Sequence, residues 1–153
     1  MTVQMDPVTR KVFCAILDDA KDLTIATNRP DGYPQATVVS FVHENGVIYF
    51  SCGRQSQKAR NIAVDDRVSV TTTAPYDDWN KIRGISMGAH ALPLTDEKEA
   101  ARVEELMMKR FPEALRFADA AKGWEIIFYR LDPVAISILD YAKGFGHAEL
   151  HGA

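Results

Sequence analysis

Four side chains that could hold an anion gather where a predicted strand passes into a short helix, within the stretch YFSCGRQSQKARNIAVDDRVSVTTT. They are Ser51, Ser56, Lys58 and Arg60. Apolar residues alternate before Gly53, recur at helical spacing after it, and return to a β-branched run from Arg67. A helix start offers free backbone N–H groups, which favour a phosphate when hydroxyls and a lysine stand beside them. The spacing therefore predicts a phosphate site at this junction.

The bulk composition fits one globular domain spanning residues 1–153. The chain has 153 residues, of which 46% are hydrophobic and 25% are charged. A net charge of -3 gives no reason to expect nucleic acid as a partner. Arg54, Lys58 and Arg60 nevertheless cluster locally, which suits one anionic group better than a long polyanion.

Cysteine usage and hydropathy predict a reduced, cytoplasmic protein with no membrane segment. The chain has two cysteines, Cys14 and Cys52, and no CxxC motif. It shows no signal-peptide pattern and no apolar run of about 18 residues. We expect Cys14 to be a small buried hydrophobe, while the polar neighbours of Cys52 leave its role open.

The pattern along the chain predicts a mainly β fold, a small antiparallel barrel with appended helices. Asp6 and Pro7 signal a helix start, and Thr95 is expected to cap a later helix that Pro112 ends. Strands are expected at 23–27, 33–43, 47–52, 67–74, 81–92, 124–131 and 134–139. Gly84 and Gly88 suggest bulges or close backbone approach in their strand. Strands outnumber the crossover helices that a parallel sheet needs, which argues against a doubly wound fold.

The ordered run LTIATNRPDGYPQATVVSFVHENGVIYFSCGRQSQKARNIAVDDRVSV, followed by KIRGISMGAHALPL, resembles a known family. It is similar to the FMN-binding split-barrel proteins related to pyridoxamine 5′-phosphate oxidase, in the short general-stress-protein branch. The resemblance covers roughly Leu23 to Leu139. It implies a six-stranded antiparallel split β-barrel and a homodimer with the cofactor at the interface.

When the family's cofactor-contacting positions are transferred to this chain, the resemblance implies where the isoalloxazine ring of FMN would lie. Thr37, Val38 and Val39 would form the strand beneath the ring, with backbone contacts to its polar edge. Ser51 and Cys52, on the neighbouring strand, would line the ring or the ribityl chain.

The resemblance also implies a phosphate site and a contribution from the second subunit. Ser56, Gln57 and Lys58 match the phosphate-binding loop and helix start. Arg83 would reach the cofactor of the other subunit, and Trp79 would either help it there or plug the barrel surface.

Two departures separate this chain from the oxidase proper. The oxidase carries an arginine for the flavin phosphate on its long strand, where this chain has Ala36. Lys58 would then need Ser56, and Arg54 or Arg60, to balance the phosphate charge. The oxidase ends in a segment that supplies tryptophan and arginine, whereas residues 143–147 here are KGFGH. Oxidation of pyridoxamine phosphate itself is therefore not expected.

The histidines near the C-terminus form the one pattern with metal-ligand spacing. His147 and His151 would present two imidazoles on one face of a helix, with Glu149 between them. Gly146 and Gly152 argue against a stable helix, so a polar tail without a metal site is the prediction. His43 and His90 are expected to face solvent.

No catalytic side chain is predicted, because a flavin brings its own redox chemistry. The first hypothesis is an FMN-dependent oxidoreductase acting on an unknown small molecule. The second keeps the fold and replaces FMN by a deazaflavin, or by haem bound through C-terminal histidines. The third is a non-enzymatic flavin-binding stress protein. The sequence names neither the substrate nor the electron donor and acceptor.

Overall fold

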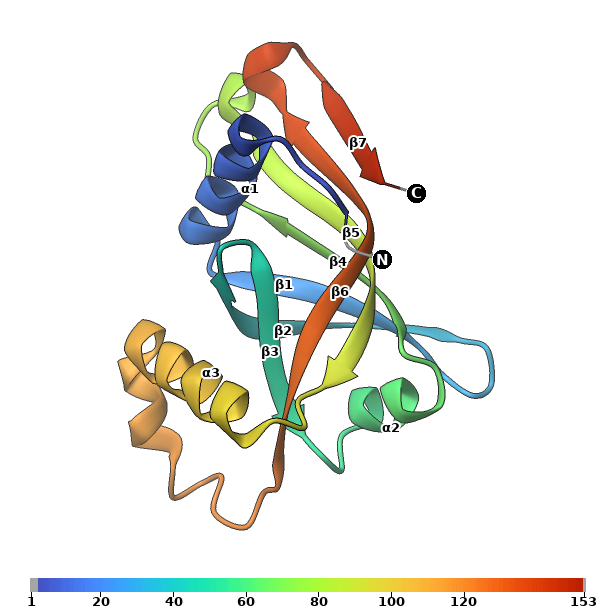
Figure 1. Cartoon of the computed structure of the whole chain (residues 1–153), viewed down its shortest axis with the longest axis vertical. Helices are drawn as coiled ribbons and strands as arrows, with labels where there is room; N and C mark the ends of the chain where they lie inside the picture. Colours follow the sequence, from blue (N-terminus) through green and yellow to red (C-terminus); the bar gives the residue numbers. More distant parts are fainter. Residues whose placement is uncertain (1–2, 153) are drawn as a thin grey trace.

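The computed structural model describes residues 3–152 and shows a mainly β protein (Figure 1). Its strands are β1 (Asp22–Asn28), β2 (Pro34–Glu44), β3 (Val47–Gly53), β4 (Arg67–Thr73), β5 (Arg83–Pro93), β6 (Ile126–Asp140) and β7 (Ala148–Gly152). Its α-helices are α1 (Pro7–Asp19), α2 (Gln57–Val64) and α3 (Glu97–Arg110). Three short 3-10 helices join them, namely η1 (Trp79–Lys81), η2 (Pro112–Phe117) and η3 (Tyr141–Lys143).

The predicted six-stranded antiparallel barrel is confirmed. Strands follow one another in the order β3-β2-β1-β4-β5-β6, and an additional pairing of β3 with β6 closes the circle. The seventh strand, β7, pairs with β6 outside this circle. Closure leaves few strand edges with unpaired backbone N–H and C=O groups, which small antiparallel proteins must otherwise protect.

The barrel is split between β2 and β3. These strands pair only from Phe41 opposite Phe50 to Glu44 opposite Val47. Beyond Phe41, β2 stays with β1 as far as Pro34, while β3 turns to pair with β6. One edge of β2 therefore has no strand partner over residues 34–40, and its backbone groups on that side face the gap.

The two strands expected at 124–131 and 134–139 are one continuous strand, β6, so that prediction is wrong in detail. The register between β5 and β6 shifts at Gly88 and Ala89, where Pro133 lies opposite Ala89. A β-bulge tolerates proline, because the hydrogen-bond pattern between the two strands is interrupted there and does not require the N–H that proline lacks. The expected irregularity at Gly88 is thus present, and it absorbs the proline without ending the strand.

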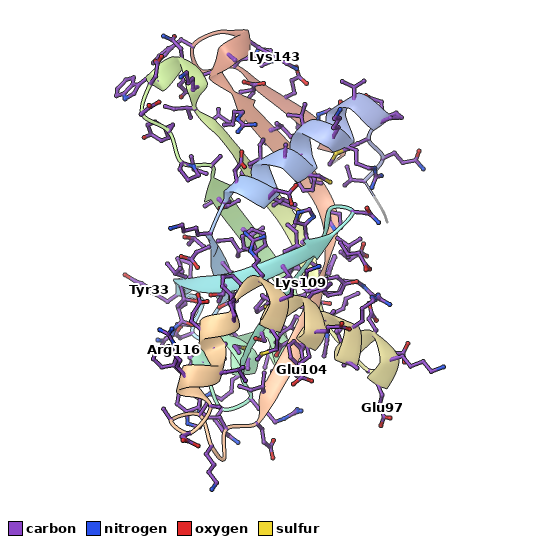
Figure 2. The ribbon with its side chains drawn as sticks, turned by 90° about the vertical axis from the view of Figure 1, so that its left-hand side faces the viewer. Tyr33, Glu97, Glu104, Lys109, Arg116 and Lys143 are labelled. Atoms are coloured by element: carbon purple, nitrogen blue, oxygen red, sulfur yellow. The ribbon has the colours of Figure 1, made fainter. Side chains whose placement is uncertain are left out.

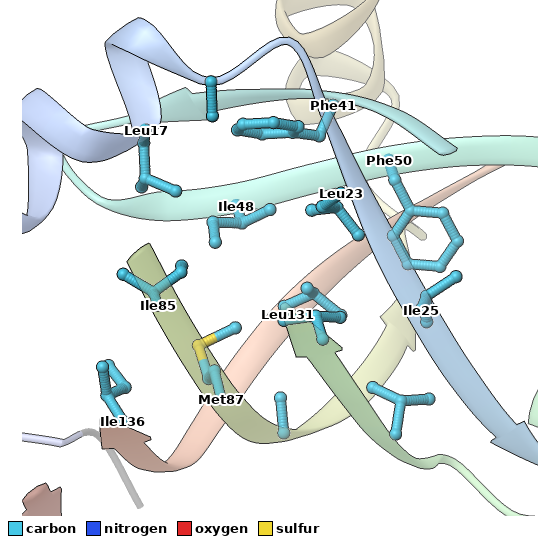
Figure 3. Packing of buried hydrophobic residues seen from close by; sticks show 14 of the residues in the cluster. Leu17, Leu23, Ile25, Phe41, Ile48, Phe50, Ile85, Met87, Leu131 and Ile136 are labelled. Atoms are coloured by element: carbon cyan, nitrogen blue, oxygen red, sulfur yellow. The ribbon is translucent and has the colours of Figure 1, made fainter. Parts of the chain in front are cut away.

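Alternating residues of the strands fill the barrel interior (Figure 3). Leu23 and Ile25 come from β1, and Phe41 and Phe50 flank the start of the split; all four are almost fully buried. Their packing follows from the two-residue period of a strand with one face inward.

Two helices cover one side of the barrel, with α1 over one half and α3 over the other (Figure 2). Asp6 caps α1 as predicted, because its carboxylate accepts from the N–H groups of Val8 and Thr9. The cap of α3 is Asp96 and not Thr95, since the Asp96 carboxylate accepts from Lys98 N. Both caps place an acceptor on otherwise unpaired helix N–H groups.

The prediction that His43 faces solvent is wrong. Its side chain is 9% exposed, and its Nε2 lies 2.7 Å from Asp18 Oδ1 of α1. The hairpin turn after β2 also contacts the ring, because Gly46 N donates to His43 Nδ1. His90 is partly exposed and pairs with Asp66 at 2.8 Å.

Candidate functional site

A pocket of about 850 Å³ opens at the split between β2 and β3. This volume suits a cofactor-sized molecule. Its walls come from β2, the end of β3, the loop into α2, the first turn of α2 and the segment before β6. The lining residues are Val38–Ser40, Ser51–Ser56, Lys58 and Gly123–Glu125.

One end of the pocket is a helix start with unpaired N–H groups. Ser56 is the N-cap of α2, and its Oγ accepts from Ala59 N at 3.2 Å. The N–H groups of Gln57 and Lys58 have no acceptor within residues 3–152. Unpaired N–H groups at the positive end of a helix favour an anion.

Lys58 is the uncommitted cation of this pocket. It lines the wall and forms no ion pair within the described chain. Arg54 also lines the pocket, but its Nε lies 2.9 Å from Glu125 Oε2. Arg60 does not line it and donates to Gln57 Oε1 at 3.1 Å. The site thus has one free positive charge and a second that is already paired.

A buried amide fixes α2 against the barrel. Asn61 is fully buried, and its Nδ2 donates to Thr27 Oγ1 of β1 at 2.9 Å. Its Oδ1 accepts from Gln57 Nε2 at 2.8 Å. The side chain of Gln57 is therefore engaged by its own helix and does not line the pocket, although sequence reasoning placed it with Ser56 and Lys58.

The other end of the pocket is the open edge of β2. Val38 and Val39 line it, and Val38 is 67% exposed, so an accessible apolar side chain lies beside unpaired backbone groups. Thr37 does not line the pocket; its Oγ1 is buried and has no hydrogen-bond partner within residues 3–152. The backbone edge, more than the threonine hydroxyl, is thus the polar feature here.

Ser51 and Cys52 line the middle of the pocket from β3. Burial raises the pKa of the Cys52 thiol, and a hydrogen bond with Ser56 and the charge of Lys58 partly offset this rise. The thiol is therefore protonated near neutral pH and acts as an apolar lining group.

Trp79 and Arg83 lie apart from the pocket of their own chain. The Trp79 ring stacks on Phe145 with centroids 6.3 Å apart. The guanidinium of Arg83 pairs with Asp19 Oδ2 at 2.8 Å. Their predicted contact is with the cofactor of a second subunit, and it stays a prediction.

Sequence reasoning missed the segment before β6 as a wall of the site. Gly123, Trp124 and Glu125 line the pocket, and Trp124 is 68% exposed. The sequence offered a weak signal, because Trp124 stands directly before the apolar run of a strand that was expected to begin with it. The strand begins only at Ile126, which leaves the tryptophan ring on the rim.

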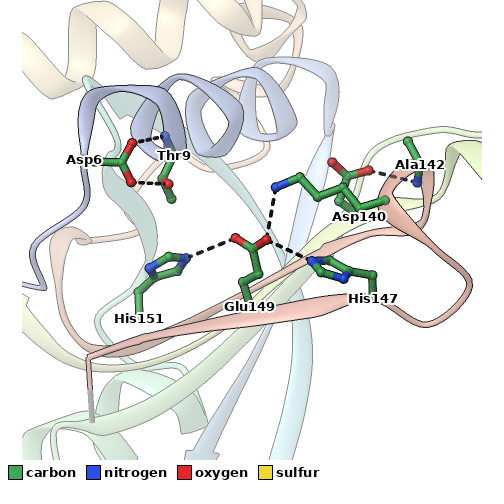
Figure 4. A network of polar contacts seen from close by, with 8 residues as sticks. Asp6, Thr9, Asp140, Ala142, His147, Glu149 and His151 are labelled. Atoms are coloured by element: carbon green, nitrogen blue, oxygen red, sulfur yellow. Dashed lines mark hydrogen bonds and ion pairs between the residues drawn. The ribbon is translucent and has the colours of Figure 1, made fainter.

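The C-terminal histidines lie on strand β7 or just before it and not on a helix (Figure 4). Glu149 lies between them, with Oε1 2.9 Å from His147 Nε2 and Oε2 4.0 Å from His151 Nε2. Lys143 Nζ also contacts this carboxylate at 3.1 Å. Hydrogen bonds from His147 and Lys143 lower the pKa of Glu149. Residues 3–152 contain no His, Cys, Asp and Glu grouping suited to a metal ion.

Over the described residues, no helix combines the length and the hydropathy that a membrane crossing requires.

The fold and the pocket define a split β-barrel, and a sequence comparison names its family. The chain belongs to the pyridoxamine 5′-phosphate oxidase family, whose sequence profile matches residues 10–135. A search of curated proteins gave no match.

Solved structures of the same fold come from several bacteria. A conserved hypothetical protein from Mycobacterium tuberculosis is 23% identical, with a TM-score of 0.75 over 99% of this chain and 95% of its own. A heme binding protein from Mycobacterium smegmatis is 17% identical, with a TM-score of 0.76 over 96% of this chain and 59% of its own. General Stress Protein 26 from Bacillus anthracis is 18% identical, with a TM-score of 0.62 over 85% of this chain and 92% of its own. These identities establish the shared fold alone.

Proposed function

We propose that this protein binds FMN in the pocket at the split and acts as a flavin-dependent oxidoreductase on a small molecule. One observation carries the proposal: a single pocket joins an uncommitted lysine at a helix start to an open backbone edge of β2. A flavin mononucleotide has a phosphate at one end and a ring with a polar edge at the other. The two ends of the pocket offer a matching partner for each.

The phosphate would be held by Lys58, the Ser56 hydroxyl and the first N–H groups of α2. The Ser56 Oγ accepts one hydrogen bond as N-cap, and its O–H, which neighbours the Cys52 thiol, can donate to the phosphate. Backbone groups of Val38 and Val39 would meet the polar edge of the ring. Bound there, the flavin supplies the electron-transfer chemistry.

The protein's own part is then to bind and orient the cofactor and to limit water around it. Cys52 is protonated, so the middle of the pocket presents no negative charge to the ring. Within this pocket Glu125 is the one carboxylate, and it is paired with Arg54. The pocket walls thus contain no free general base, in keeping with chemistry that resides in the cofactor.

The proposal includes a homodimer in which Arg83 and Trp79 reach the partner's pocket. The exposed, stacked Trp79 and Phe145 rings support this, because aromatic residues are enriched at protein interfaces. Sedimentation of the purified protein tests the dimer. Loss of FMN affinity in Arg83→Ala, with the pocket of the same chain intact, tests the contribution in trans.

The identity of the cofactor is tested by absorption spectroscopy and mass spectrometry of the small molecule released on gentle denaturation. FMN is expected, either co-purifying or taken up with about one equivalent per chain. A colourless protein that takes up no added FMN contradicts the proposal. Reoxidation of the reduced flavin by a small-molecule acceptor, with turnover on NAD(P)H, separates an oxidoreductase from a protein that only stores or senses flavin.

Haem is a second candidate, favoured by the structural likeness to the heme binding protein of M. smegmatis. In this chain the C-terminal histidines His147 and His151 surround Glu149 and do not line the pocket. A Soret band after haem titration, lost in His147→Ala or His151→Ala, would support haem over flavin. A deazaflavin would use the same phosphate end as FMN, and the released mass distinguishes the two.

A further inference from the structure

We infer that Glu125 sets how tightly the pocket holds a terminal phosphate, because it competes with that phosphate for Arg54. The inference deepens the proposed function and rests on it. It makes Glu125 a specificity-determining residue that discriminates between phosphorylated and unphosphorylated flavins.

Arg54 and Glu125 lie side by side just beyond the last residue pair of β3 and β6, Gly53 and Ile126, and two contacts join them. The backbone N–H of Arg54 donates to the Glu125 carbonyl oxygen at 2.7 Å. The Arg54 Nε lies 2.9 Å from Glu125 Oε2. Both residues line the pocket, Arg54 from the loop that leads to Ser56 and Lys58 and Glu125 from the segment before β6. The ion pair between the two side chains can therefore break while the backbone hydrogen bond keeps Arg54 and Glu125 next to each other.

The charge at the phosphate end is incomplete without Arg54. A phosphate monoester carries about −1.5 to −2 charges at pH 7. Lys58 supplies one positive charge, and the helix start adds a partial one. Arg60 does not line the pocket and is bonded to Gln57. Arg54 is thus the second full cation among the residues that line the pocket.

The pair with Glu125 is weak enough to be exchanged. Its side chains are 55% and 71% exposed, and ion pairs in water contribute little. A phosphate offers Arg54 a more highly charged acceptor with geometry suited to a guanidinium. Binding a terminal phosphate would therefore separate Arg54 from Glu125, whereas an unphosphorylated flavin would leave the pair intact.

This competition predicts opposite effects for the two members of the pair. Glu125→Gln removes the competitor without changing side-chain shape, so FMN should bind about two- to fivefold tighter. Arg54→Gln removes the second cation, so FMN should bind about tenfold more weakly. Riboflavin, which lacks the phosphate, should keep its affinity in both variants. Flavin fluorescence titration at low ionic strength gives these constants, since salt screens exposed charges.

Matched controls make the same charge changes away from the pocket wall. Glu113→Gln on η2 and Arg60→Gln on α2 are expected to shift both ligands by less than about twofold. Glu125→Ala provides a second removal of the competitor, and a thermal melt checks that each variant is folded.

A double-mutant cycle isolates the mechanism, because competition requires Arg54 to be present. In the Arg54→Gln background, Glu125→Gln should no longer tighten FMN. The same gain in both backgrounds would mean direct repulsion between Glu125 and the phosphate, which overturns the inference. An unchanged or weakened FMN affinity in the single Glu125 variants also overturns it. Wild-type protein that binds no FMN defeats the proposed function itself, a separate result.

Discussion

The Asn61 side chain donates a hydrogen bond to Thr27 Oγ1 across 2.9 Å and so ties helix α2 to strand β1. Both residues are buried. Because Ser56 caps this short helix and Lys58 lies three residues before Asn61 on it, this contact fixes where the phosphate end of the pocket lies. The position of the site thus depends on a residue that does not touch it.

Replacing Asn61 with alanine should therefore weaken both the fold and the site. Thr27 and Gln57 would lose a buried partner, at a cost of about 1–3 kcal/mol in the free energy of unfolding. We expect FMN affinity to fall as well, because the start of α2 loses its anchor. Urea denaturation and FMN titration measure the two effects, with the exposed Asn80→Ala as control. A destabilised variant with unchanged FMN affinity would show that α2 is held by other contacts.

The Cys52 thiol reports on occupancy of the pocket. In a Cys14→Ser background, alkylation of Cys52 by iodoacetamide should be slow near neutral pH, because burial raises its pKa above the ordinary value of 9.0. The rate should rise with pH as the thiolate forms. Saturating FMN should slow it severalfold at every pH, as followed by mass spectrometry. Equal rates with and without FMN would contradict a cofactor position next to Cys52.

The far end of α2 is tied down by Asp65. Hydrogen bonds from the Arg67 guanidinium and N–H, and from Asn28, hold the pKa of Asp65 well below its ordinary value of 3.8. The unfolded chain then binds this proton more readily, so the stabilisation is present above pH 3.8 and is lost as pH falls below it. Asp65→Asn should lower the melting temperature at neutral pH, and the gap to wild type should close on acidification. A gap that widens below that pH would contradict this sign.

Gly84 is a glycine that packing requires. A Cβ built there lies 2.9 Å from the Thr72 carbonyl oxygen of the paired strand. Gly84→Ala should cost about 1–3 kcal/mol of stability, the usual range for an overpacked site. Gly88→Ala is the matched control, since no atom lies within 4 Å of its Cβ. Equal melting temperatures for the two variants would show that the sheet adjusts freely.

Local rules in the sequence predicted most of the barrel. The Asp6–Pro7 helix start, the strand alternation and the irregularity at Gly88 depend on neighbouring residues alone, and all are present. The strand break expected at Pro133 is absent because a bulge accommodates it, which depends on the opposite strand. Long-range pairing of this kind leaves no local signal. The same holds for β7, whose one strand partner within residues 3–152 is β6.

The residues of the candidate site also fall into those with a local sequence signal and those without one. Ser56 and Lys58 are marked by the helix start itself, and both line the pocket. On α2 the apolar residues at helical spacing include Ala63, yet Ala63 is exposed and the polar Asn61 is buried. The burial of Asn61 is explained only by its hydrogen-bond partners on β1 and β2. Glu125 was also missed, because it is distant in sequence and reaches the pocket through the β3–β6 pairing.

The most direct test compares FMN and riboflavin binding to Lys58→Met, measured by flavin fluorescence titration beside wild type. Lys58 is the pocket's uncommitted cation, so FMN affinity should fall about 10- to 100-fold, as expected for a lost charge-assisted hydrogen bond. Riboflavin affinity should stay within about twofold of wild type, whereas Val38→Glu at the ring end should weaken both ligands alike. A selective loss of FMN is the predicted result. Equal losses of both flavins in Lys58→Met, or no loss of either, would contradict a phosphate site at the start of α2.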